Sequence, residues 1–143
     1  MKPTRINELK FTLPALSVNE GVARAVVGAF CAQLNPTVEE IADLKCAVSE
    51  AVTNAIVHAY RGDCGLIYIS VSLYADRSVA VTVRDCGCGI PDVALARQPL
   101  YTTNTDGERS GMGFSVMETF TDRLTVSSKP GRGTRVNMKK RLQ

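Results

Sequence analysis

The chain has 143 residues, of which 45% are hydrophobic and 22% are charged, a composition that fits one folded domain and excludes a disordered or fibrous protein. Its net charge is only +3, and the one dense basic run, residues 139–141, is shorter than the basic patch of a typical nucleic-acid-binding surface. No apolar stretch approaches the roughly 20 residues that a membrane span requires. We therefore expect one soluble domain, residues 1–143, that contacts neither nucleic acid nor a membrane directly.

The cysteines indicate the compartment. There are five, an odd number, without a CxxC pair, and the polar segment that follows Met1 does not have the pattern of a signal peptide. Unpaired thiols are typical of proteins in a reducing environment. A cytoplasmic location is therefore expected.

The N-terminal quarter predicts a strand followed by a helix. Residues 7–13 alternate loosely between polar and apolar, as a half-buried strand does. Segment 17–20 has the pattern of a capping box, and apolar residues then recur at helical spacing until Pro36 stops them. The predicted helix spans about 18–34.

A second capping-box pattern, Thr37 to Glu40, opens a longer predicted helix. Its apolar stripe consists of Ile41, Leu44, Val48, Val52, Ile56 and Ala59. Glu50 and Asn54 lie to one side of this stripe, one turn apart on the same helical face, beside two alanines. These small neighbours leave room for another molecule to approach the polar pair.

The remaining elements alternate between strands and short helices. The pattern predicts strands over 66–74 and 78–85 joined by a hairpin turn, a short helix over 93–97, a helix over 114–121, and strands over 123–129 and 134–140. Between 92 and 110 the chain shows little periodicity, and loops of this length in a compact domain are usually functional or disordered. The predicted fold is an α+β sandwich, with helices on one face of a mixed, mainly antiparallel sheet.

Three short motifs follow the pair of Glu50 and Asn54. Asp85 opens DCGCGI directly after a predicted strand, GMGF at 111–114 opens a helix, and GT at 133–134 starts a strand. Glycines let backbone approach a ligand, and the N–H groups at a helix N-terminus can bind an anion. Each motif alone would also fit an ordinary turn or helix entry. Their order and spacing make them specific in combination.

In this order the motifs resemble the N, G1, G2 and GT boxes of the GHKL ATPase superfamily, which includes histidine kinases, gyrase, Hsp90 and MutL. The resemblance implies the Bergerat ATP-binding sandwich, with ATP and Mg²⁺ as ligands. Asn54 would offer an oxygen to Mg²⁺, the Asp85 carboxylate would accept a hydrogen bond from the adenine amino group, and Thr134 would support it directly or through water. Glu50 would take the proton of the attacking hydroxyl.

The glycine motifs and the long loop would complete the nucleotide site. The resemblance implies that Gly87 and Gly89 let their loop lie against the base and sugar, and that Gly111 and Gly113 cradle the phosphates. Residues 98–110 would form a lid that becomes ordered when the nucleotide binds. The other residues assigned to the ATP site are Thr105, Arg109, Ser110 and Met112.

A closer resemblance covers nearly the whole chain. The segments NEGVAR, SEAVTNAIVHAY, ARQPLYTTNTDGERSGMGFSVME and GTRVNMKK resemble the anti-sigma F factor family of endospore-forming Firmicutes. The resemblance implies a dimeric serine kinase that, with ATP, holds sporulation sigma factor F inactive and phosphorylates a serine of its anti-anti-sigma factor. Arg24 resembles an arginine that this family presents to both partners, and Arg109 one that lies near the phosphates and the partner. The first strand and first helix would form the dimer and sigma surface.

Two alternatives stay open at this point. One is a binding module that sequesters the sigma factor and uses ATP only as a structural ligand, with negligible turnover. The other is the related general-stress anti-sigma B kinase, which shares the boxes but differs in the flanking segments. The presence of Glu50 favours a kinase over the binding module.

Overall fold

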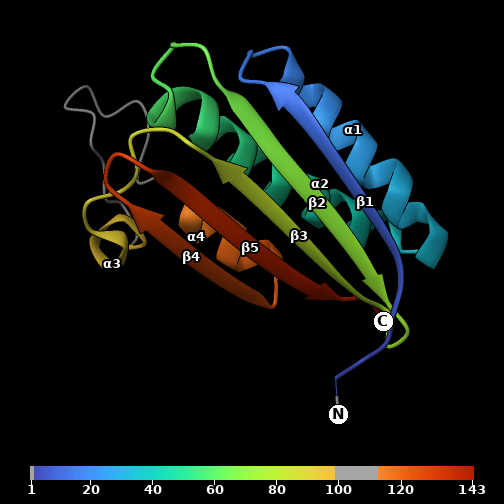
Figure 1. Cartoon of the computed structure of the whole chain (residues 1–143). Helices are drawn as coiled ribbons and strands as arrows, with labels where there is room; N and C mark the ends of the chain where they lie inside the picture. Colours follow the sequence, from blue (N-terminus) through green and yellow to red (C-terminus); the bar gives the residue numbers. More distant parts are fainter. Residues whose placement is uncertain (1, 99–112) are drawn as a thin grey trace.

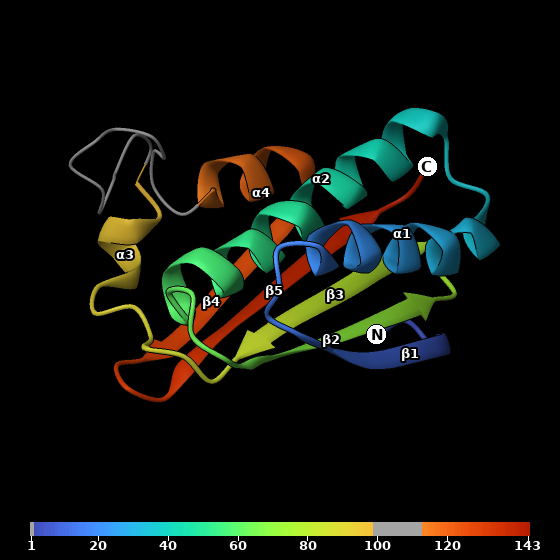
Figure 2. The same cartoon turned by 90° about the horizontal axis from the view of Figure 1, so that it is seen from above.

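The computed structural model describes residues 2–98 and 113–143, which form two layers (Figures 1 and 2). The strands are β1 (Arg5–Pro14), β2 (Leu66–Tyr74), β3 (Ser78–Asp85), β4 (Arg123–Lys129) and β5 (Gly133–Arg141). They form one sheet in the order β1-β2-β3-β5-β4, and each pair of neighbours is antiparallel. Helices cover one face of this sheet and leave the other open. The predicted α+β sandwich is confirmed, and in the described residues its sheet is antiparallel throughout.

The helical layer contains two long helices and several short ones. They are α1 (Asn19–Cys31), η1 (Ala32–Leu34, a 3₁₀ turn), α2 (Val38–Asn54), η2 (Ala55–Ala59, a π-helical turn), α3 (Val93–Ala96) and α4 (Phe114–Phe120). Within 2–98 and 113–143, no helix combines the length and apolar character needed to cross a bilayer.

The two predicted capping boxes have different outcomes. At the start of α2, Thr37 Oγ1 accepts from the Glu40 N–H at 3.0 Å, and Glu40 Oε1 accepts from the Thr37 N–H at 2.9 Å, so this capping box is confirmed. The capping box predicted at Ser17 is wrong, because α1 has no side-chain cap. The Glu20 carboxylate that would have completed it accepts a hydrogen bond from Ser49 on α2 instead.

Helix α2 changes its hydrogen-bond pattern directly after Asn54. The Tyr60 N–H donates to Ala55 O at 3.1 Å, five residues back, so η2 is one widened turn. The sequence predicts one continuous helix through Ala59, because apolar periodicity does not reveal a single widened turn. Such turns are frequent at functional sites. Here the turn contacts the loop after β3, where the Cys88 N–H donates to Ala59 O at 3.0 Å.

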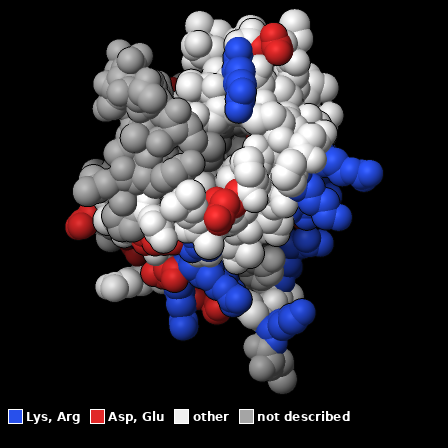
Figure 3. All heavy atoms as spheres, turned by 90° about the vertical axis from the view of Figure 1, so that its left-hand side faces the viewer, with Lys and Arg blue, Asp and Glu red and all other residues white. Residues whose placement is uncertain are grey.

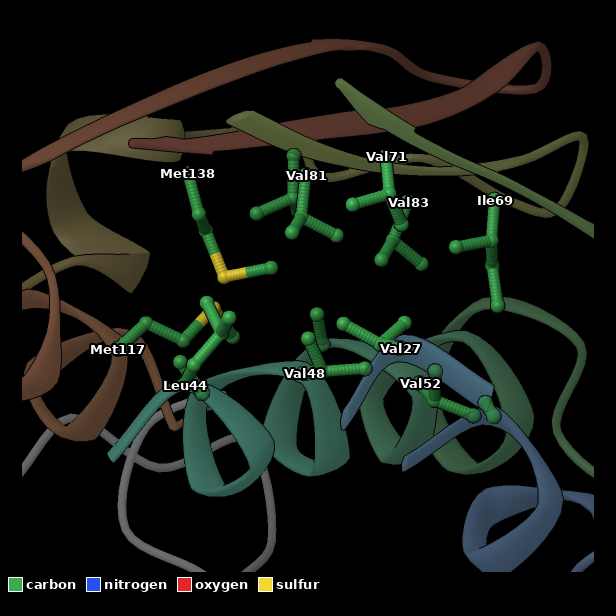
Figure 4. Packing of buried hydrophobic residues seen from close by; sticks show 14 of the residues in the cluster. Val27, Leu44, Val48, Val52, Ile69, Val71, Val81, Val83, Met117 and Met138 are labelled. Atoms are coloured by element: carbon green, nitrogen blue, oxygen red, sulfur yellow. The ribbon is translucent and has the colours of Figure 1, made fainter. Parts of the chain in front are cut away.

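The hydrophobic core lies between the helices and the covered face of the sheet (Figure 4). Val48 and Val52 of α2 are fully buried and point toward the sheet, where Val81 of β3 is also fully buried. Alternate positions of each strand supply this face, as the period of two requires. Burial of the α2 stripe fixes the rotation of the helix, and it leaves Glu50 and Asn54 half-buried at the edge of the core.

Candidate functional site

A pocket opens at the end of the sheet where β3 stops and β5 starts. It encloses about 370 Å³, part of which is open to solvent. Its apolar lining consists of Ala51, Ala59, Val83, Ile90, Phe114 and Val136, its polar lining of Asn54, His58, Asp85 and Thr134, and Gly89 of the loop after β3 also lines it. Seen from this end of the sheet, mostly uncharged side chains form the central surface, and Lys and Arg gather toward the open face of the sheet (Figure 3). An apolar pocket with a few convergent polar groups is typical of a small-molecule site.

Asp85 is the last residue of β3 and is buried, with 8% of its surface exposed. Its Oδ1 accepts hydrogen bonds from the Gly87 N–H at 2.9 Å and the Thr134 N–H at 3.2 Å. Burial raises the pKa of Asp85, and these two bonds oppose the effect. Both of these bonds go to Oδ1, and the side chain lines the pocket. This leaves Oδ2 to accept a hydrogen bond from a ligand.

Thr134 and Ser128 extend this polar group across the sheet. Thr134 faces Asp85 in the β3–β5 register and Ser128 in the β4–β5 register. Ser128 Oγ donates to Gly133 O at 3.0 Å and accepts from the Ile90 N–H at 2.7 Å. It also lies 2.9 Å from Thr134 Oγ1, and since its one proton is used, Thr134 is the donor in that pair. Ser128 therefore orients the Thr134 hydroxyl and the loop after β3.

Ser128 belongs to none of the motifs that predict the site. Its position at the pocket depends on the register of β4 against β5, where Ser128 pairs with Thr134. A register is set by tertiary packing and turn geometry, so a serine in an edge strand carries no signal of its role.

Replacing Ser128 by alanine is expected to weaken ATP binding by about threefold to tenfold, because Thr134 and the Ile90 N–H lose their partner. Isothermal titration with ATP measures the change. Ser127→Ala is the matched control, since Ser127 is exposed and precedes Ser128 on the same strand. Equal ATP affinity of both variants and the wild type would contradict the role given to Ser128.

The two glycines of the loop after β3 are required by neighbouring backbone. A Cβ on Gly87 would lie 2.5 Å from Ala59 O. Gly89 has a φ of +77°, and a Cβ there would collide with the carbonyl of Lys129. The missing side chains thus let the loop pack between η2 and the β4–β5 turn. That the same glycines lie against the base and sugar of a nucleotide stays a prediction.

Glu50 and Asn54 occupy the same face of α2, and Asn54 lines the pocket. Gly113 precedes α4 with a φ of +70°, and a Cβ on it would collide with Glu50 Oε2. The structure thus places the Glu50 carboxylate against the start of α4. The predicted site residues Thr105, Arg109, Ser110, Gly111 and Met112 lie outside the described residues.

Arg24 lies on the exposed side of α1, near α2. Its Nη1 is 3.6 Å from Glu20 Oε1, and Glu20 also accepts a hydrogen bond from Ser49, the residue before Glu50. The pKa of the Cys46 thiol is raised by burial and then by the Glu50 carboxylate, whereas Arg24 lowers it. Through Glu20 and Ser49, Arg24 is therefore connected to the turn of α2 that carries Glu50.

Comparisons with known proteins identify the fold independently. The family model described as a histidine kinase-like ATPase domain matches residues 13–140, so ATP is the ligand that the family implies. The structure of the RsbU and RsbW domains of Rv1364c from Mycobacterium tuberculosis is similar with a TM-score of 0.71 and 24% identity, over 96% of this chain and 33% of that one. The catalytic domain of the histidine kinase ThkA gives a TM-score of 0.56 and 17% identity, over 96% of this chain and 97% of that one. These two likenesses show the fold alone.

Sequence relatives are much closer. The anti-sigma F factor of Pasteuria penetrans is 53% identical over 100% of this chain and 94% of its own length. The anti-sigma F factor of Caldanaerobacter subterraneus subsp. tengcongensis is 54% identical over 98% of this chain and 96% of its own length. The anti-sigma F factor of Bacillus subtilis is 50% identical over 95% of this chain and 93% of its own length. With the matching ATPase domain and the pocket at the end of β3, these identities show that the chain belongs to the anti-sigma F factor family.

Proposed function

We propose that this chain is an ATP-dependent protein-serine kinase and anti-sigma factor, which binds sporulation sigma factor F and phosphorylates a serine of its anti-anti-sigma factor. The names of its relatives support the sigma factor as partner. The observation that carries the nucleotide assignment is the Asp85 carboxylate, whose Oδ1 is held by two backbone N–H groups, which leaves Oδ2 to accept a hydrogen bond from a ligand. Adenine offers a matching donor in its amino group, where guanine has a carbonyl.

Mg²⁺ is proposed to bind with the nucleotide and to neutralise phosphate charge. The described residues contain no group of three or more His, Cys, Asp or Glu that could hold a metal ion by themselves. Mg²⁺ is usually held by one or two protein oxygens together with phosphate oxygens and water. Asn54 fits this kind of site, because it lines the pocket and carries an amide oxygen.

Glu50 is proposed as the general base. As the serine oxygen of the partner forms its bond to the γ-phosphorus and the bond to the β-phosphate oxygen breaks, Glu50 accepts the serine proton and ADP leaves. The position of Glu50 one turn before Asn54, with its carboxylate against Gly113, supports this role.

We further propose that β1 and α1 form the homodimer and sigma surface, in the cytoplasm. β1 is an edge strand of the sheet. Four large apolar residues in or next to these elements are 44–75% exposed, namely Ile6, Leu16, Val18 and Val22. An exposed edge strand beside apolar side chains favours association with another chain.

Replacing Arg24 by alanine is expected to weaken binding of the sigma factor by about tenfold, the effect of losing an arginine anchor at an interface. ATP affinity and stability should stay unchanged, because the ion pair between Arg24 and Glu20 is partly exposed and such pairs stabilise little. Biolayer interferometry with immobilised sigma factor F and saturating ATP measures the change. Arg123→Ala, at an exposed arginine of β4, is the control. Equal sigma affinity of the two variants would contradict the assignment of Arg24.

The proposed function is tested by measuring sigma factor F binding with ATP, with ADP and without nucleotide. We expect the tightest binding with ATP. Binding that is the same in all three conditions would overturn the proposed nucleotide dependence. Nucleotide-dependent binding without transfer of phosphate to the anti-anti-sigma factor would favour the sequestering module over the kinase.

A further inference from the structure

The hydroxyl of Tyr60 joins three segments at the edge of the pocket. Tyr60 follows η2, and its hydroxyl donates to Leu66 O at 2.6 Å, at the start of β2. The same hydroxyl accepts from the Cys86 N–H at 2.8 Å, directly after Asp85. Because β3 ends at Asp85, the Cys86 N–H is held by a side chain and not by the strand ladder.

The end of η2 holds the same loop at a second point. The Cys88 N–H donates to Ala59 O at 3.0 Å, and Cys88 Sγ lies 3.3 Å from His58 O and 3.4 Å from Gly89 O, either of which can accept its proton. Carbonyls at the end of a helix have no partner within it. Here the loop after β3 supplies donors to these carbonyls. The loop is therefore held at the end of η2 by the Tyr60 hydroxyl and by the Ala59 carbonyl.

The Tyr60 ring has little freedom to leave this position. A Cβ on Gly65 would collide with the ring, so the glycine lets the ring lie against the backbone. Burial raises the pKa of the Tyr60 phenol, and the bond from Cys86 opposes this. The phenol stays protonated at neutral pH, and only the protonated form can donate to Leu66 O while it accepts from Cys86.

We propose that Tyr60 is a positioning residue for adenine recognition, which acts by holding the loop of residues 86–89. The Cys86 N–H that Tyr60 holds lies one residue before Gly87, whose N–H orients Asp85 Oδ1. Loss of the hydroxyl leaves the Cys86 N–H without its partner. The neighbouring Gly87 then moves more freely, and its hydrogen bond to Asp85 Oδ1 is weakened. The direction of Asp85 Oδ2 toward the pocket is then less well defined. The inference rests on the proposed function, in which this pocket binds ATP.

Tyr60→Phe tests the inference, with Tyr74→Phe as the matched control, because the Tyr74 hydroxyl makes no hydrogen bond to the described residues. ATP and GTP are titrated calorimetrically into the full chain, and exchange of the Cys86 amide is followed by NMR. Tyr60→Phe is expected to lower ATP affinity by about fivefold to tenfold, because the Cys86 N–H and Leu66 O both lose their partner and the loop is held less firmly. The preference for ATP over GTP should narrow and the Cys86 amide should exchange faster, whereas Tyr74→Phe should match the wild type.

A second variant keeps the hydroxyl but displaces the ring. In Gly65→Ala the new methyl group would collide with the Tyr60 ring and displace it. This variant is expected to lose the preference for ATP over GTP to the same extent as Tyr60→Phe. If Tyr60→Phe lowers only the melting temperature and leaves the ATP preference and Cys86 exchange unchanged, Tyr60 is merely structural and the inference is overturned. If the wild type itself shows no preference for ATP over GTP, the proposed function fails and the inference fails with it.

Discussion

Replacing Asp85 by asparagine is expected to lower ATP affinity by at least about 100-fold. The complex loses a charge-assisted hydrogen bond, and the new amide donor faces the adenine amino group, which is also a donor. The asparagine oxygen can still accept from the Gly87 and Thr134 N–H groups, so the loop keeps its geometry. The amide NH₂ then takes the place of Oδ2 and faces the adenine amino group. Isothermal titration with ATP measures the loss, and Asp63→Asn, at an exposed aspartate, is the control.

The same substitution separates binding from stability. Since burial raises the pKa of Asp85 above its ordinary value of 3.8, its contribution to stability is full below that value and is lost as the pH rises through the raised pKa. Without nucleotide, the asparagine variant should therefore be at least as stable as the wild type at pH 7, as measured by thermal unfolding between pH 5 and 8. A variant that loses ATP binding only because it is unfolded would contradict the role given to Asp85.

Replacing Glu50 by glutamine is expected to lower the rate of phosphate transfer by at least about 100-fold, the usual contribution of a general base. Glutamine has nearly the same shape and keeps the contact with Gly113, so ATP affinity should change by less than about twofold. Single-turnover transfer from labelled ATP to the anti-anti-sigma factor measures the rate.

Glu39→Gln is the control for Glu50, because Glu39 is an exposed carboxylate in the first turn of the same helix. It should transfer phosphate at the wild-type rate. If Glu50→Gln instead loses ATP binding and retains transfer at saturating ATP, Glu50 is part of the binding site and is not the base.

The fold could be predicted from the sequence because its elements are locally determined. Strands such as β3 alternate between buried and half-buried positions, and α2 begins with a true capping box at Thr37. The error at Ser17 has a tertiary cause, since Glu20 bonds to Ser49 on another helix. A local capping pattern contains no information about such a partner, so a correct helix was predicted with an incorrect cap.

The site could be predicted only where its residues belong to contiguous motifs. Asp85 and Thr134 stand in recognisable motifs, and the structure makes them direct neighbours on β3 and β5. Ser128 stands in no such motif and reaches the site through strand register. Tyr60 ends the segment SEAVTNAIVHAY, but that segment assigns it no role, and it reaches the loop after β3 from the end of the widened turn η2. Both features arise from packing between segments that are distant in sequence, so no local pattern could indicate them.

The central claim is that this chain transfers phosphate from ATP to a serine of its anti-anti-sigma factor. The most direct test is to incubate the two wild-type proteins with ATP and Mg²⁺ and to locate the added phosphate by mass spectrometry. We predict one phosphoserine on the anti-anti-sigma factor, formed only when both proteins and ATP are present. ATP binding to this chain without any phosphoserine on the partner would contradict the claim.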